Sequence, residues 1–241
     1  MDERRGGFRI TERDDEMVRF AGLHVAVEAR QLAEWLEMDE AHVFRRGARL
    51  AELGLLQRNR ILHDRPGAYS ATAAGLERAR LELPVARINL AHYEHSLELV
   101  SLYIELEREF GYGRVLSERQ LRSLELRALA QAERARRSHR PTHAVALRSA
   151  ARGLHFPDLV VEWGAPDGGQ LAVELELTPK SRGRRAQILA AYRDAAHVER
   201  VRYYATPEAL RALERTIEDE RVNDSAEVVE LYEWTTHKSA R

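Results

Sequence analysis

The sequence predicts a mixed α/β protein built from two domains. With 241 residues, 44% of them hydrophobic, the chain is long enough for two packed cores and too apolar for a disordered segment. Residues 11–83 have the pattern of short amphipathic helices around a hairpin, whereas residues 156–234 alternate strands with helices. The breaker Pro84 opens a short hinge, so we expect domains of residues 1–88 and 89–241.

The first domain is predicted to contain three short helices, a hairpin and a fourth helix. The helices are expected near residues 11–27, 29–37 and 39–53, with Thr11 and Asp39 as their caps. Residues 55–62 and 68–71 alternate as strands around a Pro-Gly turn, and a helix over 73–83 stops at Pro84. This order resembles the winged helix-turn-helix domain.

The charge of the first domain agrees with what that resemblance implies, which is contact with duplex DNA. Residues 41–88 hold nine arginines and four acidic residues, a net charge of +5. The resemblance places the third helix against the major groove or phosphates and the wing against the backbone. The residues concerned are Arg45, Arg46 and Arg49 in the helix and Arg58, Arg60 and Arg65 in the wing. The alternative is a protein–protein module whose arginines are simply solvated.

The second domain is organised around a hairpin predicted over residues 156–180. Both arms alternate apolar and polar residues, and residues 164–169 between them have strong turn chemistry. Parity places Asp158, Glu174 and Glu176 on one face, and closure near Pro166-Asp167 would set Asp158 roughly opposite Glu176, with Glu174 on the diagonal. Carboxylates at this spacing suit Mg²⁺. The alternative is a solvated acidic face of the sheet.

One lysine follows the acidic strand in a chain that otherwise uses arginine almost throughout. Lys180 and Lys238 are its only lysines, which indicates a need for a compact ammonium near the carboxylates. The segments Pro157-Asp158 and Glu174-Leu175-Glu176, followed by Lys180, resemble the PD-(D/E)XK nuclease superfamily. The resemblance implies a restriction-endonuclease-like α/β domain with a central mixed sheet, in which carboxylates bind Mg²⁺ or Mn²⁺ and the lysine acts on the attacking water.

The superfamily pattern assigns roles to this chain residue by residue. Asp158 and Glu174 would hold the metal, with Glu176 or Glu118 assisting, and Lys180 would orient the water. Glu118 follows a predicted capping box at Ser117, so its role is either this one or favouring the helix macrodipole. The triplet departs from the pattern because Glu176 occupies the lysine position and Lys180 lies four residues later. A DNA-binding relative that does not cut therefore stays open.

Two further basic segments follow the same logic. Residues 111–155 carry a net charge of +7, and their most basic part, residues 132–155, is either a phosphate-tracking flap or a solvated linker. The helix expected over residues 184–196 starts beside three arginines, where exposed amides and basic side chains can jointly bind DNA phosphate. These are Arg182, Arg184 and Arg185.

The whole layout resembles the replication-relaxation family of plasmid-associated and mobile-element proteins. It implies a DNA-binding protein with metal-dependent endonuclease activity, linked to plasmid or mobile-element replication, transfer or defence. The alternative is a non-catalytic regulator or replication accessory factor with a degenerate nuclease-like domain. The chain has no cysteine and no apolar run near the about 20 residues that span a membrane, so we expect a cytoplasmic protein. Duplex DNA is the expected partner, and a homodimer stays open.

Overall fold

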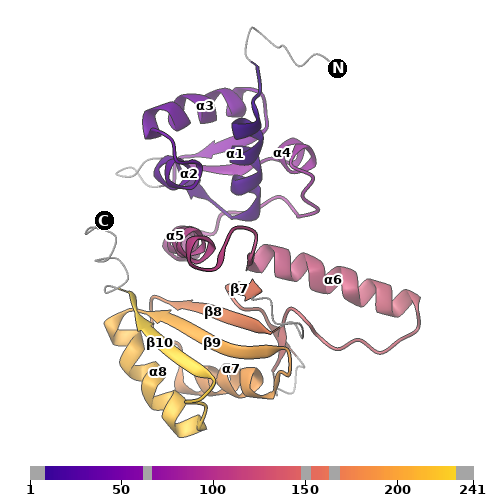
Figure 1. Cartoon of the computed structure of the whole chain (residues 1–241), viewed down its shortest axis with the longest axis vertical. Coiled ribbons are helices and arrows are strands. Elements are labelled where there is room, and N and C mark those ends of the chain that lie inside the picture. Colours follow the sequence, from indigo (N-terminus) through magenta and orange to yellow (C-terminus); the bar gives the residue numbers. More distant parts are fainter. Residues whose placement is uncertain (1–8, 62–66, 148–152, 163–168, 232–241) are drawn as a thin grey trace. The chain divides into compact units, whose positions relative to one another are not determined.

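The computed structural model describes residues 9–61, 67–147, 153–162 and 169–231 (Figure 1). The chain is mixed α/β, as the sequence predicts, and it divides into two compact units, Met1–Glu105 and Leu106–Arg241. Within the described ranges, every helix is too short or too polar to cross a lipid bilayer.

The first unit is a winged helix-turn-helix. Its helices are α1 (Glu12–Leu23), α2 (Ala29–Leu36), α3 (Glu40–Glu52) and α4 (Ala73–Arg78). Its antiparallel sheet has the order β1-β3-β2, with β1 (Val27–Glu28), β2 (Leu56–Asn59) and β3 (Ala68–Ala71). Thr11 caps α1 and Asp39 caps α3, both as predicted. The pair α2–α3 forms the helix-turn-helix, and β2 and β3 form the strands of the wing.

The greater part of a long helix completes the core of this unit. After the 3₁₀ turn η1 (Leu90–His92), α5 runs over Tyr93–Phe110. Tyr103 packs its ring edge-on against Phe20, which stacks on Trp35 with ring centroids 4.7 Å apart. The buried Gln31 side chain donates to the Leu97 carbonyl oxygen at 2.7 Å. The first unit therefore extends into α5, beyond the hinge expected at residues 84–87.

Two glycines let elements of the first unit approach more closely than a side chain would allow. A Cβ added at Gly75 in α4 would lie 2.1 Å from the carbonyl oxygen of Leu55. A Cβ added at Gly47 in α3 would lie 2.7 Å from the ring of the buried Tyr69 in β3. The second contact seats α3 directly on the wing sheet.

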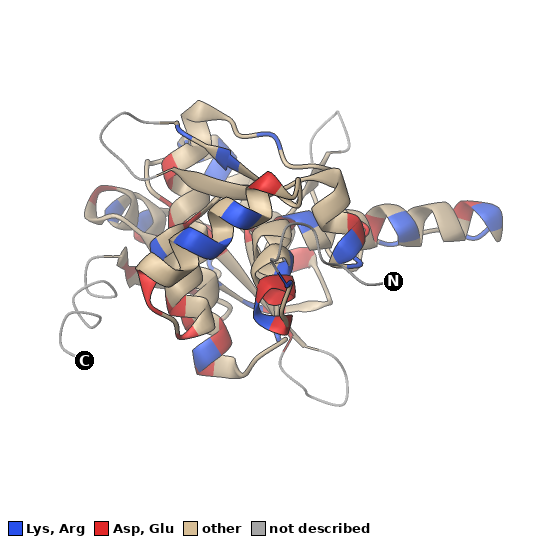
Figure 2. Ribbon diagram, turned by 90° about the horizontal axis from the view of Figure 1, so that it is seen from above, with Lys and Arg blue, Asp and Glu red and all other residues tan. Residues whose placement is uncertain are grey.

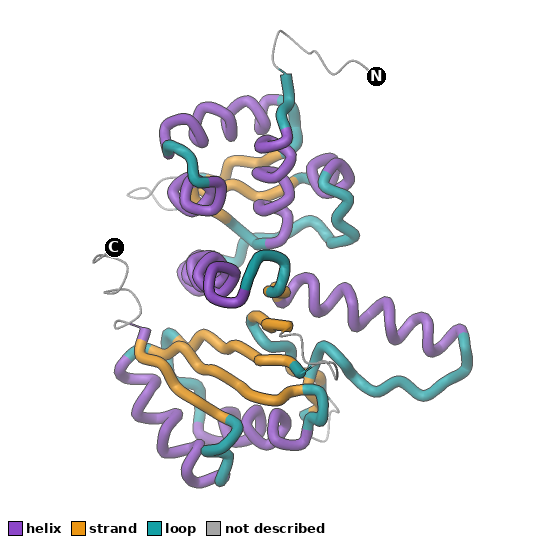
Figure 3. Tube along the Cα trace, viewed as in Figure 1, coloured by secondary structure: helices purple, strands orange, loops and turns teal. Residues whose placement is uncertain are grey.

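The second unit contains a five-stranded mixed sheet with the order β10-β9-β8-β7-β4. Figure 3 draws the strands in orange. Its strands are β4 (Val115–Ser117), β7 (Leu159–Glu162), β8 (Gln170–Glu176), β9 (Val198–Ala205) and β10 (Ala226–Glu230). β4, β7 and β8 pair antiparallel, and β8, β9 and β10 pair parallel. The parallel connections pass through α7 (Arg182–Asp194) and α8 (Pro207–Glu220), whose apolar residues pack on one face of the sheet.

A short hairpin and a loop join α6 (Glu118–Arg134) to this sheet. The hairpin pairs β5 (Val145–Ala146) with β6 (Leu154–His155). The loop before it is fixed by Glu125 of α6, which is 3% exposed. The Glu125 carboxylate accepts the backbone N–H groups of Thr142 at 3.1 Å and His143 at 2.9 Å, and it also bonds the His139 ring. This part of the predicted basic block is therefore anchored to α6.

Glu125 gives a prediction about acid stability. Burial alone would raise its pKa, but the hydrogen bonds from His139, His143 and Thr142 outweigh burial and hold the pKa below the usual 4.5. The stabilisation is therefore present above that value and is lost as the pH falls below it. We expect Glu125→Gln to cost about 1–3 kcal/mol at neutral pH, because the loop N–H groups lose their charged acceptor. Urea unfolding of this variant and of the exposed Glu214→Gln measures the difference, and equal stabilities would contradict the prediction.

Candidate functional site

The two glutamates of β8 are buried under a helix. Glu174 and Glu176 are each 2% exposed, on the face of the sheet opposite to Val173 and Leu175. This parity is the predicted one. Tyr192 of α7 donates its hydroxyl to the Glu174 carboxylate, so α7 covers the glutamate face. The interpretation of a solvated acidic face is therefore wrong, because the crossover from β8 to β9 brings a helix over it.

Strand register brings Asp158 beside Glu174. Leu159 pairs with Val173, and continuing that register by one residue sets Asp158 opposite Glu174. The sequence predicted Glu176 at this position, because the turn was expected to be centred one residue later in the chain. The Asp158 carboxylate accepts the Leu175 backbone N–H at 2.8 Å, which fixes it against β8. Asp158 and Glu174 thus lie side by side at the end of the strand pair.

A bend after β8 returns Lys180 to the carboxylates. Glu176 accepts the backbone N–H of Lys180 at 2.9 Å and its ammonium Nζ at 3.0 Å. Burial would lower the Lys180 pKa, but the charges of Glu174, Glu176 and Asp158 raise it above its usual value. Lys180 is therefore an ammonium at neutral pH. A straight strand would have carried it about 13 Å past Glu176, so the bend at Leu177 and Thr178 is what assembles this group.

Two aromatic donors hold Glu174 in place. Its carboxylate accepts a hydrogen bond from Tyr192 and contacts His155 Nε2 at 2.6 Å. The two rings meet edge to face with centroids 5.8 Å apart. Burial and the Glu174 charge raise the Tyr192 pKa well above its usual value, so Tyr192 stays a neutral donor. The sequence prediction did not include His155; its place two residues before Pro157 was the available signal.

Glu118 reaches the site through its backbone. Its N–H donates to the Asp158 carbonyl oxygen at 3.0 Å. The predicted capping box is present, since the Gln120 side chain accepts the Ser117 N–H at 2.9 Å. The Glu118 carboxylate, however, forms an ion pair with Arg122 one turn along α6. The start of α6 thus supports Asp158, while the Glu118 side chain points to a local partner.

In the described part of the chain, the site lacks three clustered ligands but has the one or two carboxylates that usually bind Mg²⁺. Across the residues that the structure describes, His, Asp and Glu side chains form no group of three or more arranged to hold a metal ion. Mg²⁺ is usually bound by one or two carboxylates and retains several waters. The adjacent pair Asp158 and Glu174 supplies two, with Glu176 next along the same face. The chemistry of the donors therefore fits a hydrated Mg²⁺ held by two carboxylates.

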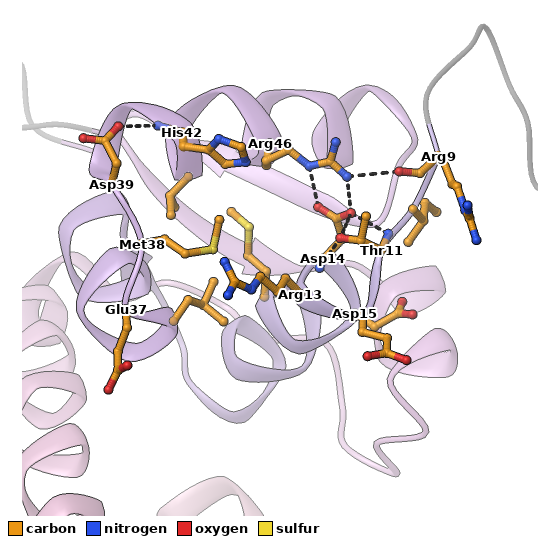
Figure 4. Close-up of a pocket in the computed structure, with 15 residues that line it drawn as sticks. Arg9, Thr11, Arg13, Asp14, Asp15, Glu37, Met38, Asp39, His42 and Arg46 are labelled. Atoms are coloured by element: carbon orange, nitrogen blue, oxygen red, sulfur yellow. Dashed lines mark hydrogen bonds and ion pairs between the residues drawn. The ribbon is translucent and has the colours of Figure 1, made fainter.

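The three arginines of α3 are in different environments. Arg45 and Arg49 are exposed, and Arg49 forms an ion pair with Glu52 one turn later. Arg46 turns inward and donates from Nε to Asp14 of α1 at 2.7 Å, as Figure 4 shows. Asp14 is 2% exposed and also accepts both the N–H and the hydroxyl of Thr11 at 2.7 Å. Arg46 therefore joins α3 to α1, and its predicted contact with DNA stays a prediction.

This ion pair lies at the edge of a cavity of about 990 Å³ between the start of α1 and the turn from α2 to α3. Met17 and Val43 are apolar parts of its wall, and Asp39 and His42 lie at the start of α3 (Figure 4). The first turn of α3 therefore lines this cavity.

The wing arginines also differ. The Arg58 guanidinium lies over the ring of Phe44, 4.5 Å from its centroid, so a wing residue and a residue of α3 form one exposed surface. Arg60 is exposed at the end of the wing strand. Arg65 lies outside the described residues. Figure 2 shows the basic residues over the chain.

Two of the three arginines at the start of α7 bond other residues of the second unit. Arg182 pairs with Asp219 at 2.9 Å. Arg185 donates to the Thr216 hydroxyl at 3.1 Å and to the Lys180 carbonyl oxygen, so it fixes the bend that returns Lys180. Arg184 is exposed. Of the three, Arg184 has the surroundings that a phosphate contact requires.

Comparison with models of protein families and with curated proteins finds no match. Among solved structures, RV1404 from Mycobacterium tuberculosis is 16% identical, over 54% of this chain and 77% of that one, with a TM-score of 0.28. The zinc-responsive MarR family member ZitR from Lactococcus lactis is 20% identical, over 55% and 83%, with a TM-score of 0.28. The adhesin competence repressor AdcR from Streptococcus pyogenes is 16% identical, over 53% and 83%, with a TM-score of 0.28. The winged helix is therefore assigned from its own strand order, and the nuclease and replication-relaxation resemblances stay predictions.

Proposed function

We propose that this chain binds duplex DNA through its winged helix and hydrolyses a DNA phosphodiester bond at Asp158, Glu174, Glu176 and Lys180 with Mg²⁺ or Mn²⁺. The observation that carries the proposal is the return of the Lys180 ammonium to the carboxylates of β8. A lysine held among three acidic residues at a strand end is the arrangement that the PD-(D/E)XK resemblance implies.

The charge of the group supports a cation. Three carboxylates and one ammonium leave a formal charge of −2, and two of the carboxylates are almost fully buried. Buried like charges are costly unless they are paired or bind a metal. A divalent ion held by Asp158 and Glu174 would balance the charge. When bound, it supplies Lewis-acid polarisation of the phosphate and a lower pKa for the attacking water.

The protein residues around this pair would orient it. The Leu175 N–H holds Asp158, and Tyr192 and His155 hold Glu174, so neither carboxylate has to be ordered when substrate arrives. Lys180 would orient the water and offset the charge that develops on the phosphate. Glu176 keeps the ammonium in place and assists on the metal side. The Glu118 side chain would have to leave Arg122 to contribute.

The first unit would select the DNA. Arg45 and Arg49 are exposed on α3, and Arg58 and Arg60 extend that basic surface into the wing. Exposed arginines on the second helix of a helix-turn-helix suit the major groove and its phosphates. A link to plasmid or mobile-element replication, transfer or defence, in the cytoplasm, is the biological setting that the replication-relaxation resemblance suggests.

The second candidate is a non-catalytic regulator or replication accessory factor. It is favoured by the complete internal pairing of Glu176 with Lys180 and of Glu174 with Tyr192 and His155, which satisfies these groups without a metal. Both candidates require DNA binding. They differ in whether the second unit performs chemistry.

DNA binding is tested by removing the two exposed arginines of α3. We expect Arg45→Ala/Arg49→Ala to weaken duplex binding and to reduce the slope of log K against log salt by about two, since each phosphate contact contributes about 0.9. Fluorescence anisotropy over a salt series measures both effects. The matched control is Arg211→Ala/Arg215→Ala, which removes the same charge from exposed positions of α8. Equal binding by the two double variants would move the contact away from α3.

Hydrolysis is tested by incubating the protein with supercoiled, linear and single-stranded DNA, with and without Mg²⁺ or Mn²⁺. Nicking or cleavage that depends on the metal is the expected result. DNA binding without cleavage of any substrate would overturn the nuclease and leave the regulator.

A further inference from the structure

One side of α6 carries an exposed apolar pair between two opposite charges. Leu126 is 65% exposed and Leu129 is 39% exposed, and both rank among the large apolar side chains that the structure leaves open. Arg122 lies four residues before Leu126, and Glu133 lies four residues after Leu129. These spacings place all four on one side of the helix. We call Arg122, Leu126, Leu129 and Glu133 the α6 stripe.

The α6 stripe is complementary to itself in the antiparallel direction. A two-fold axis between residues 127 and 128 sets Leu126 of one copy against Leu129 of the other. The same axis sets Arg122 against Glu133, and it does so twice. A two-fold interface must be self-complementary in this way, since each pair of contacts occurs in both directions. In the parallel direction, the two arginines would face each other instead.

The surroundings of Arg122 prepare it for such a contact. Its guanidinium lies over the ring of Phe156, 4.4 Å from the centroid, and pairs with Glu118 while the side chain stays 54% exposed. Contacts that already order a long side chain reduce the entropy lost when it pairs across an interface. The side chains of Arg122, Leu126, Leu129 and Glu133 are all exposed, although the buried Glu125 lies one turn of α6 from Arg122 and from Leu129.

We propose that the α6 stripe is the interface through which two copies of this chain form an antiparallel dimer. The occupant is a second copy because the arrangement of charges fits the same helix reversed. Such a dimer would contain two winged helices. Two-fold DNA-binding dimers read inverted half-sites whose spacing follows from the symmetry of the protein.

Charge exchange across the dimer tests this proposal. We expect the wild type to be a dimer in sedimentation equilibrium. Arg122→Glu and Glu133→Arg should each raise the dimer Kd by roughly tenfold or more, because two attractive pairs become repulsive. An equimolar mixture of the two single variants should form heterodimers, because every pair across the axis is then opposite in charge. The double variant R122E/E133R should dimerise again by itself.

The matched control is Arg127→Glu, which makes the same charge change at an exposed residue on another side of α6. It should leave the dimer Kd unchanged. Circular dichroism checks that each variant is folded, and the recovery of association on mixing would itself show that the single variants fold. A monomeric wild type would overturn the proposal, as would single variants that dimerise like the wild type, or a mixture that associates no better than its components.

Discussion

Lys180→Ala is expected to abolish metal-dependent cleavage while leaving the affinity for duplex DNA within a few-fold of the wild type. The lysine lies among Asp158, Glu174 and Glu176, where its charge would act on the transition state. Loss of one positioned donor of this kind typically reduces the rate by about 10²-fold to 10³-fold. One charge is a small part of a contact with many phosphates, so binding is maintained. Single-turnover nicking assays and anisotropy titrations on the same preparation separate the two effects.

Two further variants define this result. Lys180→Arg should also be impaired, because a planar guanidinium does not replace a compact ammonium on a flexible stem. Arg211→Ala removes an exposed charge from α8 and should cleave at close to the wild-type rate. Wild-type cleavage by Lys180→Ala would remove the lysine from the mechanism and leave Glu176 as the candidate for its position.

Arg46→Ala is expected to destabilise the first unit by about 3 kcal/mol, the scale for removing one partner of a buried ion pair. Asp14 would stay buried and keep only its hydrogen bonds from Thr11. Arg45→Ala, one residue earlier and exposed, should change stability little. Urea unfolding of the full chain measures both stabilities, from the transition that occurs at the lowest urea concentration. If the two variants were equally stable, Arg46 would be a surface residue and its groove contact would again be open.

The pH dependence of this pair has a definite sign. Burial would raise the Asp14 pKa, but hydrogen bonds from Arg46 and Thr11 outweigh burial and lower it from the usual 3.8. A carboxylate with a lowered pKa stabilises the fold above its ordinary value and loses that contribution as the pH falls through the lowered one. The difference in stability between the wild type and Arg46→Ala should therefore be largest near neutral pH and should shrink in acid.

Local patterns predicted the elements well. The bounds of α8, Pro207–Glu220, agree with its sequence, because a proline at the first position and a regular apolar period both act within the segment itself. The parity of β8 is also correct, since alternation is a property of the strand alone. The winged helix follows from the order of such elements.

The features that the sequence did not reveal depend on distant residues. Whether the face with Glu174 and Glu176 is buried depends on the crossover that places α7 over it. The inward turn of Arg46 depends on Asp14, which is 32 residues away. The strand register depends on how β7 and β8 pair along their whole length. His155 lies in β6, a strand of two residues, and so short a strand shows no periodicity in the sequence. Its contact with Glu174 therefore had no periodic signal.

The charged inner face of β8 has a consequence for the chain while it is still folding. The β7–β8 hairpin can close before α7 and β9 follow, and its opposite face is apolar throughout. A short apolar strand without charges is a template for pairing with other chains, and inward-pointing charges suppress that pairing. Until Tyr192 and Lys180 are in place, Glu174 and Glu176 keep one face of the hairpin hydrated and mutually repulsive between copies. We therefore expect the same two carboxylates to limit aggregation of the unfinished sheet.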